Sequence, residues 1–176
     1  LRVTASGRTD AGVHALGQVV HFDTPAGSAL PPDAWLRALN VHLPPSIRVM
    51  ESRLVPDTFH ARFDATGKTY RYRLWTGAVL PPLEAGLACH HPRPLDLTAL
   101  TWACQAIQGT HDFTNFAAFR GHEDGTEDNV RTLWTLAPRV EGAVLTLTFH
   151  GSGFLYKMVR LLTGGLLRVA TGRESQ

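Results

Sequence analysis

The sequence is poor in cysteine and has no long apolar run. Its 176 residues include two cysteines, Cys89 and Cys104, which are too few for a disulfide framework and are typical of a reducing cytoplasm. The longest apolar stretch, residues 161–169, contains two glycines and Arg168 and is far shorter than the roughly 20 residues that cross a bilayer. We therefore expect a cytoplasmic protein with no membrane partner.

Motifs for metals and nucleotide cofactors are also missing. The sequence has no GxGxxG, GxxxxGK[ST] or HExxH motif, and no serine or cysteine in a nucleophile-elbow pattern. The cluster Cys89-His90-His91 with Cys104 lacks the ligand spacing of a zinc site. We expect no metal and no cofactor.

Charge is nearly balanced in total but uneven along the chain. The formal net charge is +2, and all but two of the 17 basic residues are arginines. The planar guanidinium suits phosphate and base edges, although a codon bias would give the same preference for arginine. Residues 60–73 and 157–173 are basic, whereas residues 121–129 form an acidic segment that we expect to be an exposed loop.

Periodicity predicts an α+β fold in which helices cover a mainly antiparallel sheet. Strands are predicted over residues 1–5, 18–23, 46–54, 68–75, 130–138 and 143–150, with Gly142 in a turn before the last of them, and helices over residues 31–43, 96–108 and 153–170. The elements divide into two similar halves, residues 1–80 and 81–176, of one domain.

Asp10 lies in a glycine-flanked loop, two residues after Arg8 and four before His14. A carboxylate near an arginine stays ionised and oriented, so Asp10 could act as a nucleophile or a base. The alternative is that Asp10 caps a turn, as aspartate often does. His14 is compatible with a purely structural role.

Two basic segments have a possible functional role. Residues 60–73 place Arg62, Lys68, Arg71 and Arg73 among tyrosines, which suits a surface that binds phosphate and stacks an unpaired base. The alternative is a strand with an aromatic core face and a solvated arginine face. In the last predicted helix, Lys157 and Arg160 share one face, and a buried Arg160 would need a carboxylate partner such as Asp10. The alternative is a solvated helix edge, or cations that favour the helix C-terminus.

Four blocks, in the same order, resemble the TruA-type tRNA pseudouridine synthases. The first, GRTDAGVHALGQVVHFDT, closely resembles the family signature, and the others are FHARFDATGKTYRYRL, HDFTNFAAF and FLYKMVRLLTGGLLRV. The likeness implies an isomerase that converts uridine to pseudouridine at positions 38, 39 and 40 of the tRNA anticodon stem-loop. It also implies the pseudouridine synthase fold, with a mixed, mainly antiparallel sheet in two ferredoxin-like halves, and a homodimer that binds tRNA.

The resemblance assigns roles to individual residues. Asp10 would be the catalytic aspartate, Arg160 would pair with it, and Tyr70 would pack on the target base. Contacts with RNA would come from the basic and aromatic residues around them, namely Arg8, His60, Arg62, Lys68, Tyr70 and Arg71. The chemistry at Asp10 could be attack at C1′, attack at C6, or removal of a proton at C2′.

The chain departs from the family pattern at both ends. It lacks the family's strand and helix before the signature and the last segment after residues 154–169. We therefore expect a fragment, and the alternative function is a non-catalytic RNA-binding piece of such an enzyme.

Overall fold

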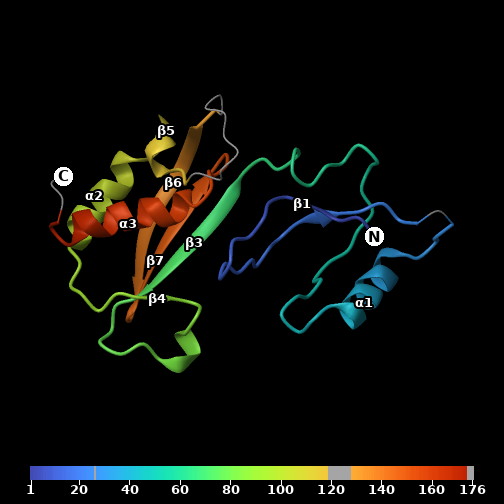
Figure 1. Ribbon diagram of the computed structural model, residues 1–176, viewed down its shortest axis with the longest axis horizontal. Coiled ribbons are helices and arrows are strands. Elements are labelled where there is room, and N and C mark those ends of the chain that lie inside the picture. Colours follow the sequence, from blue (N-terminus) through green and yellow to red (C-terminus); the bar gives the residue numbers. More distant parts are fainter. Residues whose placement is uncertain (26, 119–127, 174–176) are drawn as a thin grey trace. The chain divides into compact units, whose positions relative to one another are not determined.

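A computed structural model describes residues 1–25, 27–118 and 128–173 of the chain. The chain forms two compact units, residues 1–65 and 66–176, called unit 1 and unit 2 below (Figure 1). The strand at residues 68–75, which the sequence analysis assigned to the first half, belongs to unit 2. The division into two ferredoxin-like halves stays a prediction.

Unit 1 has little regular structure. Its strands β1 (Thr4–Ala5) and β2 (Val20–His21) pair antiparallel, within the two segments predicted as strands. Helix α1 (Pro32–His42) begins with proline at its first position, where no N–H is needed, and ends just before Pro44. Among the described residues of unit 1, only Ala61 is buried.

The strand predicted over residues 46–54 is wrong. This segment forms no strand, and its Val49 backbone pairs with a side chain instead: the amide of Asn40 donates to the Val49 carbonyl at 2.8 Å and accepts from the Val49 N–H at 2.9 Å. Most of its apolar side chains are exposed, Ile47 at 53% and Met50 at 83%, and Val49 is half-buried. Alternating apolar residues therefore do not mark a buried face here.

Unit 2 is built on a five-stranded sheet of order β4-β3-β7-β6-β5. Its strands are β3 (Lys68–Trp75), β4 (Cys89–His90), β5 (Gly109–Asp112), β6 (Val130–Glu141) and β7 (Val144–Gly151). Only β3 and β4 run parallel, so the prediction of a mixed, mainly antiparallel sheet is confirmed. The turn between β6 and β7 uses Gly142 at a φ of +58°, as predicted.

Helices α2 (Leu97–Ala106) and α3 (Met158–Ala170) pack against each other and form a core with one face of the sheet (Figure 1). Asp96 caps α2, its carboxylate accepting the N–H groups of Thr98 and Ala99 at 2.9 and 3.0 Å. The sheet contributes every second residue, so that Leu145, Leu147 and Phe149 are at most 1% exposed. This alternation leaves the opposite face of the sheet without a helix in the described part of unit 2.

Helix α3 begins five residues later than predicted. The backbone of Lys157 is left-handed, with a φ of +58°, so the helix starts only at Met158. Phe154 therefore precedes the helix, and Lys157 shares no helical face with Arg160. Within the helix, Leu161 is 40% exposed, whereas the next residue, Leu162, is 1% exposed.

Two short edge strands were not predicted. β4 lies in the connection between β3 and α2, beyond a 3-10 turn at Pro82–Glu84, and β5 precedes a second such turn at Thr114–Phe116. All but the last two residues of the predicted acidic loop, residues 121–127, lie outside the described part. No helix in the described ranges is long and apolar enough to span a membrane.

Candidate active site

The loop that carries Asp10 is held at its start by contacts with the strand opposite. The N–H of Ser6 donates to the Val19 carbonyl at 2.8 Å, and the hydroxyl of Ser6 donates to the side chain of Gln18 at 2.7 Å. The Gln18 amide donates in turn to the Gly7 carbonyl at 2.8 Å. These bonds anchor the residues immediately before Arg8 and Asp10.

Asp10 itself opens a tight turn. The N–H of Val13 donates to the Asp10 carbonyl at 3.0 Å, and Gly12 has a φ of +76°, which a residue with a side chain rarely adopts. The side chain of Asp10 is half-buried, and within the described part of the chain it makes no hydrogen bond or ion pair. The turn is thus closed by the backbone. The alternative that the Asp10 carboxylate caps the turn does not apply, because the carboxylate does not close it.

A second loop of unit 1 contains two predicted RNA contacts. The Nδ1 atom of His60 accepts the N–H groups of Arg62 and Phe63, both at 3.2 Å, so the ring donor of His60 is Nε2. The His60 ring stacks on Phe63 with centroids 4.1 Å apart, and the backbone N–H of His60 donates to the Asp64 carboxylate at 2.8 Å. Arg62 is exposed, with its guanidinium 6.0 Å from the Phe63 ring. His60 therefore orders the loop that presents Arg62.

In unit 2, β3 separates its aromatic and basic side chains. Tyr70 and Tyr72 pack against the buried core on the helix-covered face. Arg71 is exposed, and Arg73 pairs with Glu84 at 3.0 Å. The strand therefore confirms the predicted alternation, but its tyrosines and arginines do not form one shared surface.

Tyr70 is oriented by a residue that precedes α3. Its ring meets Phe154 edge-on, with centroids 4.9 Å apart and an angle of 76° between the ring planes. This arrangement is a favoured one for aromatic pairs. Phe154 was predicted to lie within the helix, but it precedes α3 and contacts Tyr70 from there.

Arg160 lies in the first turn of α3, and its charge acts on a tyrosine of β3. Burial raises the pKa of the Tyr72 hydroxyl above its usual value, and interaction with the Cys89 thiol adds to the rise. The Arg160 guanidinium lowers the same pKa, which shows that its charge acts at Tyr72. Tyr72 was not among the predicted site residues, although it lies on the same face of β3 two residues after Tyr70.

The predicted residues thus fall into two groups. Arg8, Asp10, His60 and Arg62 belong to unit 1, and Lys68, Tyr70, Arg71 and Arg160 belong to unit 2. Within unit 2, Tyr70 and Arg160 lie on the helix side of the sheet and Arg71 on the other. The pairing of Arg160 with Asp10 stays a prediction.

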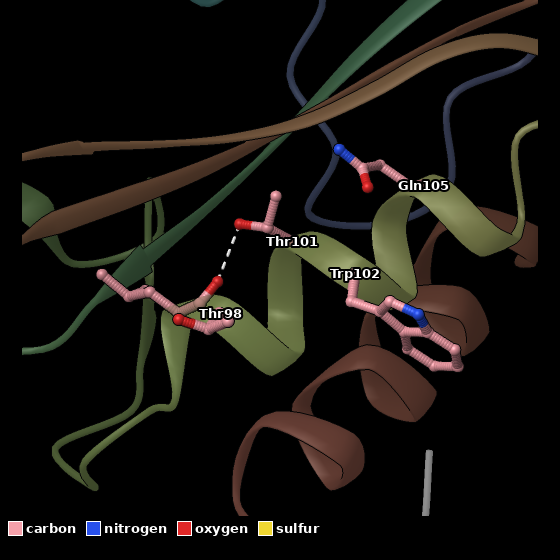
Figure 2. A pocket seen from close by; sticks show the side chains of 5 residues that line it. Thr98, Thr101, Trp102 and Gln105 are labelled. Atoms are coloured by element: carbon pink, nitrogen blue, oxygen red, sulfur yellow. Dashed lines mark hydrogen bonds between the residues drawn. The ribbon is translucent and has the colours of Figure 1, made fainter.

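None of these residues lines the groove along the outer side of α2. This groove, about 470 Å³ in volume, is lined by Leu97, Thr98, Thr101, Trp102 and Gln105. Figure 2 shows its side chains rising from a single helix, with the Thr101 hydroxyl donating to the Leu97 carbonyl at 2.7 Å. Nor do three metal-binding side chains (histidine, cysteine, aspartate or glutamate) gather anywhere in the described ranges.

Comparison with known proteins gives one consistent family. The family described as tRNA pseudouridine synthase matches residues 1–64 and 103–176. The tRNA pseudouridine synthase A of Akkermansia muciniphila is 48% identical over 175 residues, which cover 98% of this chain and 66% of that protein. The enzymes of the same name from Geobacillus kaustophilus and Halalkalibacterium halodurans are 43% and 46% identical.

These two alignments cover 99% of this chain and 66% and 65% of the two relatives. The chain therefore spans about two thirds of the length of the curated relatives it matches. Within that span the match includes the loop of Asp10 and the helix of Arg160. On this evidence the chain belongs to the tRNA pseudouridine synthase family.

Proposed function

We propose that this protein isomerises uridine to pseudouridine at positions 38, 39 and 40 of the tRNA anticodon stem-loop, with Asp10 as the catalytic nucleophile. The observation that carries the proposal is the Asp10 turn. It lies in the matched part of the chain and holds a half-buried carboxylate that makes no hydrogen bond or ion pair within the described part of the chain.

The reaction needs no external reactant. The bond between C1′ and N1 of the target uridine breaks, the base turns, and C5 forms a new bond to C1′. The proton on C5 leaves, and N1 gains a proton, so the product is an isomer of the substrate. In the nucleophilic route the Asp10 carboxylate bonds to C1′ as the base leaves, and it is displaced when C5 attacks.

Other residues would support this step. Arg160 would pair with Asp10 and keep it ionised, and Tyr70, held edge-on by Phe154, would pack on the target base. A target base within a stem must leave the stack, at a cost of a few kcal/mol, so RNA contacts around the pocket are needed. Arg8, His60, Arg62, Lys68 and Arg71 are the side chains that we propose for those contacts.

Tritium release from tRNA labelled at C5 of uridine tests the proposal directly, because the C5 proton is lost only when the new bond forms. The protein expressed from its complete gene should release tritium, and Asp10→Asn should abolish release while binding tRNA as tightly as the parent. Asp57→Asn, an exposed aspartate of the same unit, is the matched control and should leave release unchanged.

Release from Asp10→Asn at the rate of the parent would remove Asp10 from the mechanism. Binding of tRNA without any release from the parent would instead favour the alternative, a non-catalytic RNA-binding piece. We also propose that the protein is a cytoplasmic homodimer, which sedimentation at several protein concentrations would test. The two unpaired cysteines, Cys89 and Cys104, support a reducing compartment.

A further inference from the structure

The sheet face opposite α2 and α3 carries an aromatic and basic patch, of which the proposed function uses only Arg71. Every second residue of β7 faces this side, and none of Thr146, Thr148 and His150 is fully buried. From β3 the same face receives Thr69 and Arg71, which pair in register with His150 and Thr148. This face is thus polar, with threonines between its aromatic and basic side chains.

Trp134 is presented on this face by an irregularity in β6. The register between β6 and β7 shifts between Leu133 and Thr135, so Trp134 is an extra residue in the strand. Such a bulge re-aims the side chain that it carries. The Trp134 side chain is 44% exposed, and its ring lies against His150 with centroids 4.8 Å apart.

The position of the Trp134 ring depends on the absence of a side chain at Gly67. A Cβ atom on residue 67 would lie 2.5 Å from Cζ3 and 2.9 Å from Cη2 of the indole. On its other side, the ring rests on His150, whose Nδ1 lies 3.0 Å from the Thr69 hydroxyl, within hydrogen-bond distance. An aromatic ring that is exposed but already ordered loses little freedom when a ligand stacks on it.

Arg71 supplies the charge beside this ring. It lies two residues after Thr69 on the same face, which corresponds to about 7 Å along a strand. Its guanidinium makes no hydrogen bond or ion pair with any described residue, whereas Arg73 is paired with Glu84 and Arg139 with Glu141. Arg71 is therefore the arginine of β3 that is available to an anion.

We propose that Trp134 and Arg71 form an RNA-binding patch distinct from the Asp10 loop, in which Trp134 stacks on an unpaired base and Arg71 binds the adjacent phosphate. The proposal rests on the proposed function in so far as RNA is the ligand. Stacking on an exposed aromatic beside a cation is how proteins hold single-stranded nucleic acid. A second copy of the chain fits this face less well, because the threonines between the two residues offer little of the apolar area typical of homodimer interfaces.

The test measures the affinity of a fluorescein-labelled single-stranded oligouridylate by anisotropy, over a range of salt concentrations. Trp134→Ala should weaken binding at least about fivefold with no change in the salt dependence, because stacking involves no counterion. Arg71→Ala should weaken binding and lower the slope of log Kd against log salt by about 0.7, the value for one phosphate contact on a single strand.

Two matched controls lie on the same unit. Trp102→Ala removes an indole that is 48% exposed but belongs to α2, and Arg139→Ala removes an arginine from the far end of the same sheet face. Both should bind the probe within about twofold of the parent. Gly67→Ala should displace the Trp134 ring without removing it, and should weaken binding as Trp134→Ala does.

Unchanged affinity of Trp134→Ala, or a Trp102→Ala loss of the same size, overturns the proposal. So does a shift from dimer to monomer in Trp134→Ala, which would make the patch a subunit interface. If Trp134→Ala does not fold, Gly67→Ala and Arg71→Ala decide the question. Tritium release separates the two proposals. If the parent protein releases tritium but Trp134→Ala and Arg71→Ala bind the oligouridylate as the parent does, only the patch is refuted. If the patch binds the oligouridylate but the parent releases no tritium, only the isomerase activity is refuted.

Discussion

Alanine at Gly151 and alanine at Gly164 should change the stability of unit 2 in opposite directions. Gly151 ends β7, where a Cβ atom would lie 2.5 Å from the carbonyl oxygen of Thr132 and 3.2 Å from Cδ2 of Leu133. The nearest atom belongs to the backbone of β6, so a side-chain rotation cannot relieve the clash. The two strands must separate beside the bulge that presents Trp134.

Overpacking of this kind costs about 1–3 kcal/mol. At Gly164, in the interior of α3, a Cβ atom meets nothing within 4 Å, and alanine restricts the unfolded chain more than glycine does. Gly164→Ala should therefore stabilise the protein by about 1 kcal/mol. For a domain of this size, 1 kcal/mol corresponds to roughly 4 °C in Tm.

Urea unfolding followed by tryptophan fluorescence is the suitable assay, since Trp75, Trp102 and Trp134 all belong to unit 2. Gly151→Ala should lower the midpoint and Gly164→Ala should raise it, both with an unchanged m-value. Equal stability of Gly151→Ala and the parent, within about 0.5 kcal/mol, would show that β6 and β7 do not approach as closely as described. A destabilised Gly164→Ala would refute the open surroundings of that residue.

The remaining predictions concern Arg160 and the cysteines. Arg160→Met should lower the rate of tritium release at least tenfold and leave the Kd for tRNA unchanged; release within about twofold, under ~0.5 kcal/mol in the barrier, would exclude Arg160 from catalysis. Burial raises the pKa of the Cys104 thiol to about 11, so at pH 8 a thiol reagent should modify the exposed Cys89 quickly and Cys104 only on unfolding. A fast reaction that persists in Cys89→Ser would contradict this assignment. Because the Cys104 thiol ionises at a lower pH in the unfolded chain than in the folded one, Cys104 should make the folded state less stable as the pH rises from about 9 towards 11.

The elements predicted best are those in which pattern and burial agree. β3 was predicted with its observed bounds because Tyr70, Tyr72 and Leu74 alternate with polar side chains and pack into the core. α2 was predicted to begin near residue 96, and the Asp96 carboxylate caps the helix there. In both cases the local signal and the tertiary contacts favour the same structure.

The errors arise where a distant partner decides the structure. Residues 46–54 alternate like a strand, but the segment pairs with the side chain of Asn40 instead of a neighbouring strand. β4 is only two residues long, and both of its side chains are exposed, so its own sequence carries no strand pattern. It becomes a strand because it pairs with Leu74 and Trp75 at the end of β3. The bulge at Trp134 likewise depends on the register between β6 and β7, which no local pattern records.

The individual residues of the candidate site could be predicted from the sequence. Which face of the sheet each of them occupies could not. Asp10 and Arg160 were identified by motif, whereas Phe154 was misplaced in α3 because its spacing continues the helical period through the left-handed Lys157. Tyr72 was missed because alternation alone gave it a core position. Its interaction with the Cys89 thiol and the electrostatic effect of Arg160 come from two elements distant in sequence.

The separation of tyrosines and arginines on β3 has a consequence for kinetics. Tyr70 packs on Phe154 on the helix side, and Arg71 is exposed on the opposite face, so the two side chains cannot hold the same nucleotide. A contact with RNA far from the reacting base contributes equally to the ground state and the transition state, and its loss raises KM without changing kcat. A contact with the reacting groups lowers kcat when it is lost. Arg71→Ala and Arg160→Met should therefore change different kinetic constants, and a fall in kcat for Arg71→Ala would place the open face of the sheet at the reacting base.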